Sequence, residues 1–268
     1  MSFLILFASV LIVFVIGLLL GFVIAAASHF LAVKKEERIG QIEAVLPGAN
    51  CGACGYAGCA AYAEAIISEG APANKCTSLT ADGMAQIGKI TGRETAAAGE
   101  PEKAFIACHA QPFAPESQRF DYNGLTDCNA RALFYKGSKK CKYGCLGGGS
   151  CMEVCPARAI YRDKSGRVMI DRQKCISCCK CVSVCPMNVI VMIPESADYA
   201  VACSHPGKGV QTKQDCSVGC LGCSLCTKKS PEGGFVMNGF LARIDYSQKG
   251  SRSEAAEKCP AHCIVKLK

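Results

Sequence analysis

The sequence predicts a chain with two parts: an apolar N-terminal helix, and an α+β body whose small domains fold around groups of cysteines. Residues 1–33 contain no charged side chain, although the 268-residue chain carries 30 basic and 22 acidic residues. The rest of the chain holds all 22 cysteines. Half of all residues are hydrophobic, which argues against disorder. Cysteine this dense indicates either disulfides or bound metal, and the spacings favour metal.

Residues 1–33 are predicted to form a retained transmembrane helix, because about 20 apolar residues cross a bilayer core. A cleaved signal peptide is the alternative, but the chain lacks the basic start that such a peptide needs. Lys34, Lys35 and Arg38 follow directly. The positive-inside rule therefore places the N-terminus outside and the body in the cytoplasm, where thiols stay reduced. We expect a single-pass protein of the cytoplasmic membrane.

Residues 34–92 are predicted to form a small α-rich domain around one [4Fe-4S] cluster. Three cysteines crowd one glycine-rich loop, Cys51-x2-Cys54-x4-Cys59, and Cys76 follows at a distance. Glycines allow the positive φ angles that a loop needs to fold around a cluster. Zinc is the rival, but zinc sites usually pair two short C-x-x-C elements. Residues 60–69 are predicted to be a helix that ends at Gly70 and Pro72.

Residues 93–137 are predicted to be a linker or irregular region. Cys108 and Cys128 stand alone there, and isolated cysteines are more often small buried hydrophobic residues than ligands. The sequence assigns neither of them a role.

Residues 138–197 give the strongest signal, because they contain two Cys-Pro runs of the bacterial ferredoxin type. The runs read Cys141-x3-Cys145-x5-Cys151-x3-Cys155-Pro156 and Cys175-x2-Cys178-x2-Cys181-x3-Cys185-Pro186. In such runs the fourth cysteine binds the other cluster. The predicted ligands are therefore Cys141, Cys145, Cys151 and Cys185 for one [4Fe-4S] cluster, and Cys155, Cys175, Cys178 and Cys181 for the other. Two short strands, at 159–162 and 167–171, are expected between the runs, and Cys179 is interpreted as a bystander.

Residues 198–268 are predicted to form a degenerate second ferredoxin-like module with one cluster. The ligands would be Cys220, Cys223, Cys226 and Cys259. The other site of a two-cluster frame would need cysteines at four positions that instead hold Ser230, Lys249, Arg252 and Ala255. All four ligands of that site are thus absent together.

Two alternatives remain open for the third unit. Cys216 or Cys263 could replace Cys259, or Cys203 and Cys216 could join Cys108 and Cys128 around a further cluster.

The net charge of +8 does not predict nucleic-acid binding. In four clusters, the sixteen thiolates would add negative charge, and the oxidised inorganic cores would offset part of it. The net effect would cancel about eight positive charges. No basic run with interleaved aromatic residues occurs either.

The order of these motifs resembles that of the B subunits of the Rnf complex. The resemblance rests on the apolar N-terminus, the loop Gly48-Ala49-Asn50-Cys51-Gly52-Ala53-Cys54-Gly55-Tyr56, and the opening Cys141-Lys142-Tyr143-Gly144-Cys145-Leu146-Gly147. It covers nearly the whole chain, except that longer members can carry a complete third unit. It implies an electron-relay subunit of a membrane-bound, ion-translocating oxidoreductase. Soluble ferredoxin would be the donor, NAD usually the final acceptor, Na⁺ or H⁺ the translocated ion, and the other subunits the partners.

A membrane-anchored polyferredoxin of a hydrogenase or formate dehydrogenase is the alternative function. The Cys51–Cys76 pattern argues against it, because generic polyferredoxins only repeat the ferredoxin run. No catalytic residue is predicted in the chain itself, since its four histidines are scattered and no nucleophile motif occurs.

Overall fold

The N-terminal part is one helix, α1 (Ser2–Phe30), in a computed structural model that describes residues 2–30, 36–93 and 100–267. The side chains described along it, such as Leu11 and Phe22, are exposed. Among the described residues, no helix meets the combined length and hydropathy that crossing a bilayer requires, so the predicted transmembrane helix is not confirmed. Lys34 and Lys35, on which the predicted orientation depends, lie outside the described residues.

The first unit of the body is helical. Its elements are α2 (Glu37–Val45), α3 (Cys59–Ser68), a 3₁₀ turn (Ala73–Lys75) and α4 (Ala81–Thr91). They pack around a core that includes Ile42, Tyr62 and Ile87, each almost fully buried. The helix expected over 60–69 is confirmed as α3, and Gly70 follows it with a φ of 71°. The α-rich interpretation of this unit therefore holds.

The second unit is a ferredoxin-like α+β module with two antiparallel strand pairs. Its strands are β1 (Glu102–Ile106), β2 (Ile160–Arg162), β3 (Val168–Ile170) and β4 (Ile190–Pro194), and its helices are α5 (Cys128–Leu133), α6 (Ser150–Glu153) and α7 (Lys180–Val184), with a 3₁₀ turn at Pro115–Ser117. β1 pairs with β4, and β2 pairs with β3. The two strands expected between the cysteine runs are confirmed as the β2–β3 hairpin, whose turn is closed by Asp163 Oδ1 accepting from the amides of Ser165 and Arg167 (both 2.9 Å).

The linker expected over 93–137 is wrong for two segments. Glu102–Ile106 forms β1, in register with β4 from Glu102 opposite Pro194 to Ile106 opposite Ile190. Cys128–Leu133 forms α5. β1 escapes sequence analysis because it is short and its partner lies far along the chain. Within the region 93–137, residues 94–99 lie outside the described residues.

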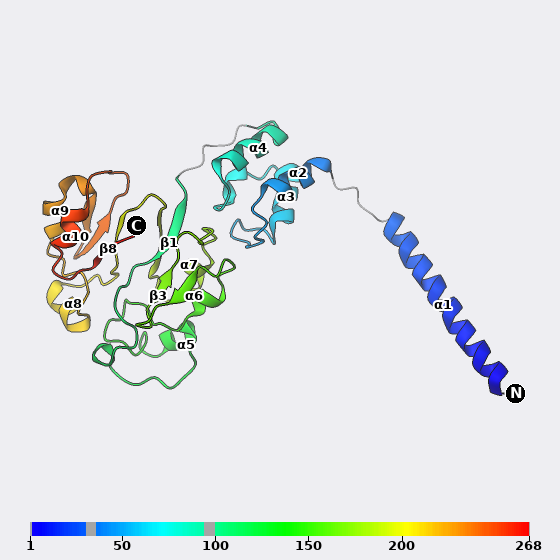
Figure 1. Cartoon of the computed structure of the whole chain (residues 1–268), viewed down its shortest axis with the longest axis horizontal. Coiled ribbons are helices and arrows are strands. Elements are labelled where there is room, and N and C mark those ends of the chain that lie inside the picture. Colours follow the sequence, from blue (N-terminus) through cyan, green and yellow to red (C-terminus); the bar gives the residue numbers. More distant parts are fainter. Residues whose placement is uncertain (1, 31–35, 94–99, 268) are drawn as a thin grey trace.

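The third unit repeats the strand pairing of the second. Its elements are β5 (Tyr199–Val201), α8 (Gly209–Asp215), α9 (Leu225–Lys229), a 3₁₀ turn (Pro231–Gly233), β6 (Phe235–Asn238), β7 (Leu241–Ile244), α10 (Ser253–Glu257) and β8 (Ile264–Lys266). β5 pairs with β8 and β6 with β7, so an outer pair again encloses an inner hairpin. This is the expected degenerate ferredoxin-like fold, and Figure 1 shows it beside the second unit.

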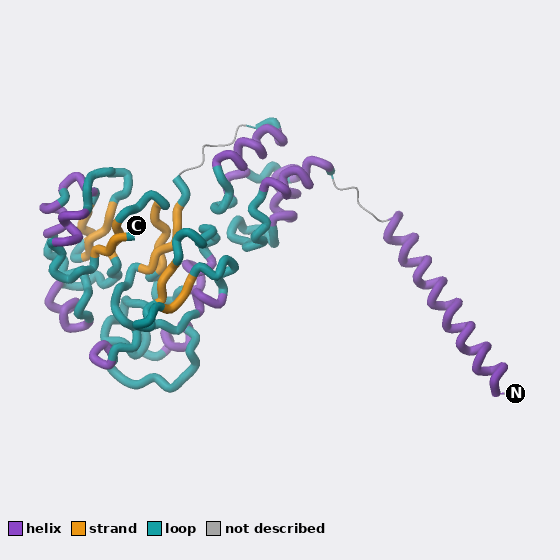
Figure 2. Tube along the Cα trace, viewed as in Figure 1, coloured by secondary structure: helices purple, strands orange, loops and turns teal. Residues whose placement is uncertain are grey.

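Hydrogen bonds join the three units. Thr77 Oγ1 donates to the carbonyl of Ser177 (2.7 Å), which ties the first unit to the second. The amide of His109 donates to the carbonyl of Ala202 (3.1 Å), and Ser204 Oγ donates to the carbonyl of Ala107 (2.9 Å). Most of the cysteines lie in loops and turns, the kind of segment that Figure 2 draws in teal.

Candidate cluster-binding sites

Four cavities are each lined by at least four cysteines. No group of three or more His, Cys, Asp or Glu side chains in the described part of the chain is arranged to hold a single metal ion. The cysteines instead surround voids, and thiolates around a compact void are the donor set of a [4Fe-4S] cluster. The residues present therefore fit this cofactor.

The first cage consists of Cys51, Cys54, Cys59 and Cys76. The loop is shaped by Asn50, whose Oδ1 accepts from the amide of Cys59 at 2.8 Å. A Cβ at Gly58 would stand 2.8 Å from that same oxygen, so any other residue there would displace the Asn50 side chain. Tyr62 closes the far side by donating to the carbonyl of Pro72 (2.6 Å). The structure thus brings together all four cysteines expected for this site.

The second cage consists of Cys155, Cys175, Cys178 and Cys181. Cys155 comes from the first Cys-Pro run and the other three from the second, so the crossed arrangement is present in the geometry. Cys179 also lines this cavity, with a φ of 56° and its thiol donating to the carbonyl of Ser177 (3.4 Å). The bystander role of Cys179 therefore stays a prediction.

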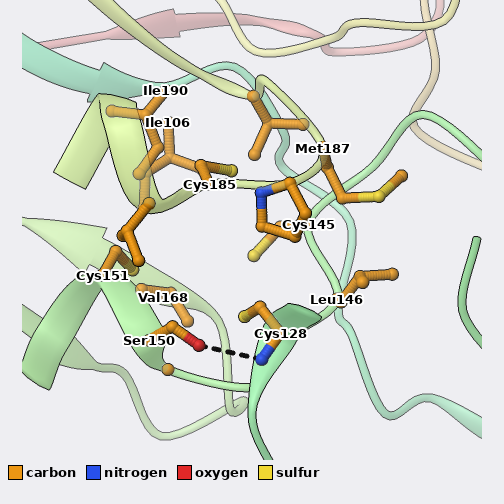
Figure 3. A pocket seen from close by; sticks show the side chains of 14 residues that line it. Ile106, Cys128, Cys145, Leu146, Ser150, Cys151, Val168, Cys185, Met187 and Ile190 are labelled. Carbon is orange, nitrogen blue, oxygen red and sulfur yellow. Dashed lines mark hydrogen bonds between the residues drawn. The ribbon is translucent and has the colours of Figure 1, made fainter. Parts of the chain in front are cut away.

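The third cage differs from the sequence prediction in one ligand. Its cavity is lined by Cys128, Cys145, Cys151 and Cys185, whereas Cys141 is not among the lining residues (Figure 3). Cys141 instead lies on the other side of its loop, where its thiol is close to those of Cys108 and Cys216. The longer spacing of the first run, with three residues between Cys141 and Cys145, separates the two thiols.

Cys128 is held in place by Ser150, the residue that precedes Cys151. The amide of Cys128 donates to Ser150 Oγ (2.8 Å), drawn as the dashed line in Figure 3, and Ser150 Oγ donates to Asp127 Oδ2 (2.7 Å). Asp127 also caps α5 by accepting from the amide of Ala130 (2.9 Å). These bonds place the start of α5 against the start of α6. Sequence reasoning missed Cys128 because it stands alone, and the capping Asp127 just before it is the only local signal.

The fourth cage consists of Cys220, Cys223, Cys226 and Cys259, and Cys263 also lines its cavity. Cys263 Sγ lies 3.7 Å from Cys259 Sγ, where either thiol can donate, and it also forms a hydrogen bond with Cys220 Sγ. These bonds lower the pKa of Cys259 to about 5 and that of Cys220 to about 6, and they raise the pKa of Cys263. Cys259 therefore lies in the fourth cage at the position that the spacing predicts, and Cys263 lies beside it in the same cavity.

The place of the missing cluster in the third unit is filled by a hydrogen-bonded arginine. Arg252 is buried and donates to the carbonyls of Gly233 (Nε, 2.7 Å) and Gln248. Its Nη1 donates to Asp198 Oδ1 (2.8 Å), and Ser230 Oγ accepts from the amide of Ala255 (3.2 Å). Three of the four residues that replace ligands therefore form the packing of the filled site.

Backbone amides donate to the cage sulfurs in a repeated pattern: the amide two residues after a cysteine donates to its Sγ. The pairs are Gly147 to Cys145 (3.4 Å), Ser78 to Cys76, Lys180 to Cys178 and Gly222 to Cys220. Burial raises the pKa of Cys145 and Cys151 to about 12 each. A buried thiol loses its proton only where the thiolate is stabilised. A bound metal cluster and the amide donors would provide this stabilisation.

Two protein families match parts of the chain. An Fe-S cluster family matches residues 46–78, which include the first cage. The 4Fe-4S dicluster domain matches residues 138–186, which include most of the second and third cages.

Curated relatives are similar over most of the chain. The chain is 38% identical to the B subunit of the proton-translocating ferredoxin:NAD(+) oxidoreductase complex of Clostridium ljungdahlii, over 93% of this chain and 88% of that protein. It is 34% identical to the B subunit of the Na(+)-translocating ferredoxin:NAD(+) oxidoreductase complex of Acetobacterium woodii, over 93% and 74%. It is 33% identical to the B subunit of the ion-translocating oxidoreductase complex of Methanosarcina acetivorans, over 93% and 94%.

Proposed function

The chain belongs to the family of B subunits of ion-translocating oxidoreductase complexes, and from that premise we propose how it relays electrons. It binds [4Fe-4S] clusters in its cysteine cages, receives electrons from reduced ferredoxin and passes them to other subunits. There they reduce NAD⁺ while Na⁺ or H⁺ is translocated. Ferredoxin, NAD⁺ and the two ions are named for the relatives from Clostridium and Acetobacterium.

The observation that carries this proposal is the adjacency of the cages. Burial and neighbouring thiols raise the pKa of Cys178, in the second cage, and Cys51 of the first cage is one of those neighbours. Burial raises the pKa of Cys151, in the third cage, and Cys181 of the second cage contributes. The first, second and third cages therefore follow one another, as a relay requires.

The chain's own residues hold and insulate the clusters. A bound [4Fe-4S] cluster supplies a one-electron carrier whose potential depends on hydrogen bonds and solvent exposure. The amides that donate to the cage sulfurs stabilise thiolate charge, and apolar walls such as Ile106, Val168 and Ile190 exclude water from the third cage. Four cages would hold about sixteen iron atoms.

We further propose that residues 1–33 tether the body to the cytoplasmic side of the membrane. The proposal rests on the uncharged N-terminal sequence and on the exposed apolar side chains described along α1. Exposed apolar area of this extent is stable only against lipid or another apolar surface.

Stopped-flow mixing tests the proposed relay. The full chain, loaded with iron and sulfide under anaerobic conditions, is mixed with reduced ferredoxin while cluster absorbance is followed. We expect the chain's clusters to become reduced as ferredoxin is oxidised, with the iron-free chain as the control. If the iron-loaded chain remains oxidised over minutes, the proposed donor is wrong.

A further inference from the structure

Four cysteines outside the four cages come from three distant segments. Cys108 follows β1, Cys141 opens the first Cys-Pro run, and Cys203 and Cys216 precede and follow α8. Cys141 and Cys216 line one cavity together with Lys139 and with His109, the neighbour of Cys108. Burial, and after it the nearby Cys108 thiol, raises the pKa of Cys141, Cys203 and Cys216. The Cys216 thiol is among the neighbours that raise the pKa of Cys141. The fold therefore gathers these cysteines at the junction between the second and third units.

Cys108 and Cys141 lie close together on either side of Gly144. A Cβ on Gly144 would stand 3.3 Å from Cys108 Sγ and 3.6 Å from Cys141 Sγ, so the two sulfurs flank the same backbone position. Lys139 Nζ would lie 3.5 Å from that Cβ. Gly144 is buried, and a side chain at this position would intrude among the sulfurs.

The segments that carry these cysteines are braced against one another. The hydrogen bonds from His109 to Ala202 and from Ser204 to Ala107 hold the backbone on both sides of Cys108 and Cys203. Buried His205 bonds to Thr212 Oγ1 and to Asp215 Oδ2 (both 3.0 Å), which fixes the end of α8 and with it Cys216.

Three of the four sulfurs show the same amide pattern as the four cages. The amide of His205 donates to Cys203 Sγ (3.4 Å), that of Tyr143 to Cys141 Sγ, and that of Val218 to Cys216 Sγ. Each donor is two residues after its cysteine, as at Cys145 and Cys220. Amides aimed at sulfur are the usual surroundings of a cluster-ligating thiolate.

A buried lysine adds an independent observation. Lys139 is only 2% exposed, and its ammonium donates to the carbonyl of Cys145 (3.3 Å). Within the described residues it forms no ion pair with a carboxylate. A buried cation needs a negative partner. A four-thiolate cluster beside it would supply that charge.

We infer that Cys108, Cys141, Cys203 and Cys216 form a fifth cage, which binds a further [4Fe-4S] cluster between the third and fourth cages. On the side of the third cage, the Cys108 thiol is among the neighbours that raise the pKa of Cys145. On the side of the fourth cage, the amide of Cys220 donates to Cys203 Sγ (3.3 Å). The fifth cage thus links the ferredoxin-like module to the third unit. It rests on the proposed cluster-binding function and extends it to five carriers in one row.

The unaltered full chain gives the first test, because it needs no substitution. After anaerobic loading with iron and sulfide, we expect about 20 iron atoms and about five electrons taken up per chain. About sixteen iron atoms and about four electrons would overturn the fifth cage while leaving the four-cage relay intact. Zinc in place of iron would overturn the proposed function itself.

Substitutions give the second test. We expect Cys216→Ala and Cys108→Ala each to lose about four iron atoms and the same component of the electron paramagnetic resonance (EPR) spectrum of the reduced protein. Ser217→Ala, which changes the exposed neighbour of Cys216, is the matched control and should keep all iron. Cys141→Ala should lose the same component as Cys216→Ala, and Cys128→Ala a different one. Full iron in Cys216→Ala, or the same loss in Cys128→Ala and Cys216→Ala, would overturn the assignment.

Discussion

The second and third units have the same strand pairing but use it differently. In both, an outer antiparallel pair encloses an inner hairpin. The second unit places one cage at each end of this frame, the second and the third cages. The third unit keeps only the fourth cage, and buried Arg252 with Ser230 and Ala255 fills the position of the other. One frame therefore holds either a cysteine cage or a hydrogen-bonded arginine at the same place.

This difference shows that a cluster site is lost as a whole. A half-site would leave buried thiols without the metal that makes their burial favourable. In the third unit the guanidinium satisfies carbonyls instead, with Asp198 as its counter-charge. Polar groups that are fully hydrogen-bonded can replace a metal as an organising centre for a short loop.

The largest expected effect is on the unit with two cages. Cys185→Ala should remove about four iron atoms, and it should remove them from the third cage first. Cys185 lines the third cage, although the other three cysteines of its run line the second. Cys155→Ala should remove iron from the second cage first, because Cys155 lines that cage. Iron analysis and EPR of the reduced proteins measure both changes. Selective loss of the second cage in Cys185→Ala would show that the crossed arrangement does not bind iron as proposed.

Cys259 and Cys263 form a matched pair in the third unit. Cys259→Ala should lose about four iron atoms, because Cys259 is a ligand of the fourth cage. Cys263→Ala should keep them, since Cys259 already completes the four ligands that the spacing predicts, although the potential of that cluster should fall as the hydrogen bond between the two thiols is lost. Iron analysis and a redox titration separate the two effects. Equal iron loss in both variants would make Cys263 a ligand.

Substitution of Arg252 tests whether this arginine stabilises the part of the third unit that has no cysteine cage. Arg252→Leu should keep all iron but lower the stability of the third unit by about 2 kcal/mol, because buried carbonyls lose their donors. Lys249→Ala, at another replaced ligand position but exposed, should change stability little. Anaerobic thermal melting with iron analysis measures both. A loss of iron in Arg252→Leu with normal melting would contradict the structural role.

The smallest effect on the clusters is expected from removing residues 1–33. The cages are built from residues 51–259, so the truncated chain should keep its iron and leave the membrane fraction. Fractionation and iron analysis of the two lengths provide the measurement. Iron loss on truncation would mean that the N-terminal segment takes part in folding the body.

The sequence predicts most of the cluster sites, because cysteine spacing reports directly on loops that fold around one cofactor. The twelve cysteines of the first, second and fourth cages converge where their spacing predicts. Cys128 is not predicted, since its place depends on the contact between Asp127 and Ser150 across distant segments. β1 escapes prediction for the same reason, as its partner β4 lies far along the chain. Spacing reveals local loops, and it does not reveal which distant loops meet.

The most direct test of the central claim is the metal content and spectrum of the full chain isolated under anaerobic conditions. Mössbauer spectroscopy with iron, zinc and acid-labile sulfide analysis identifies what the cages hold. We predict that the iron is present as [4Fe-4S] clusters, with equal amounts of sulfide and without stoichiometric zinc, and that reduced ferredoxin reduces these clusters. Stoichiometric zinc bound by the cage cysteines, or iron that is not in four-iron clusters, would contradict the proposed electron relay.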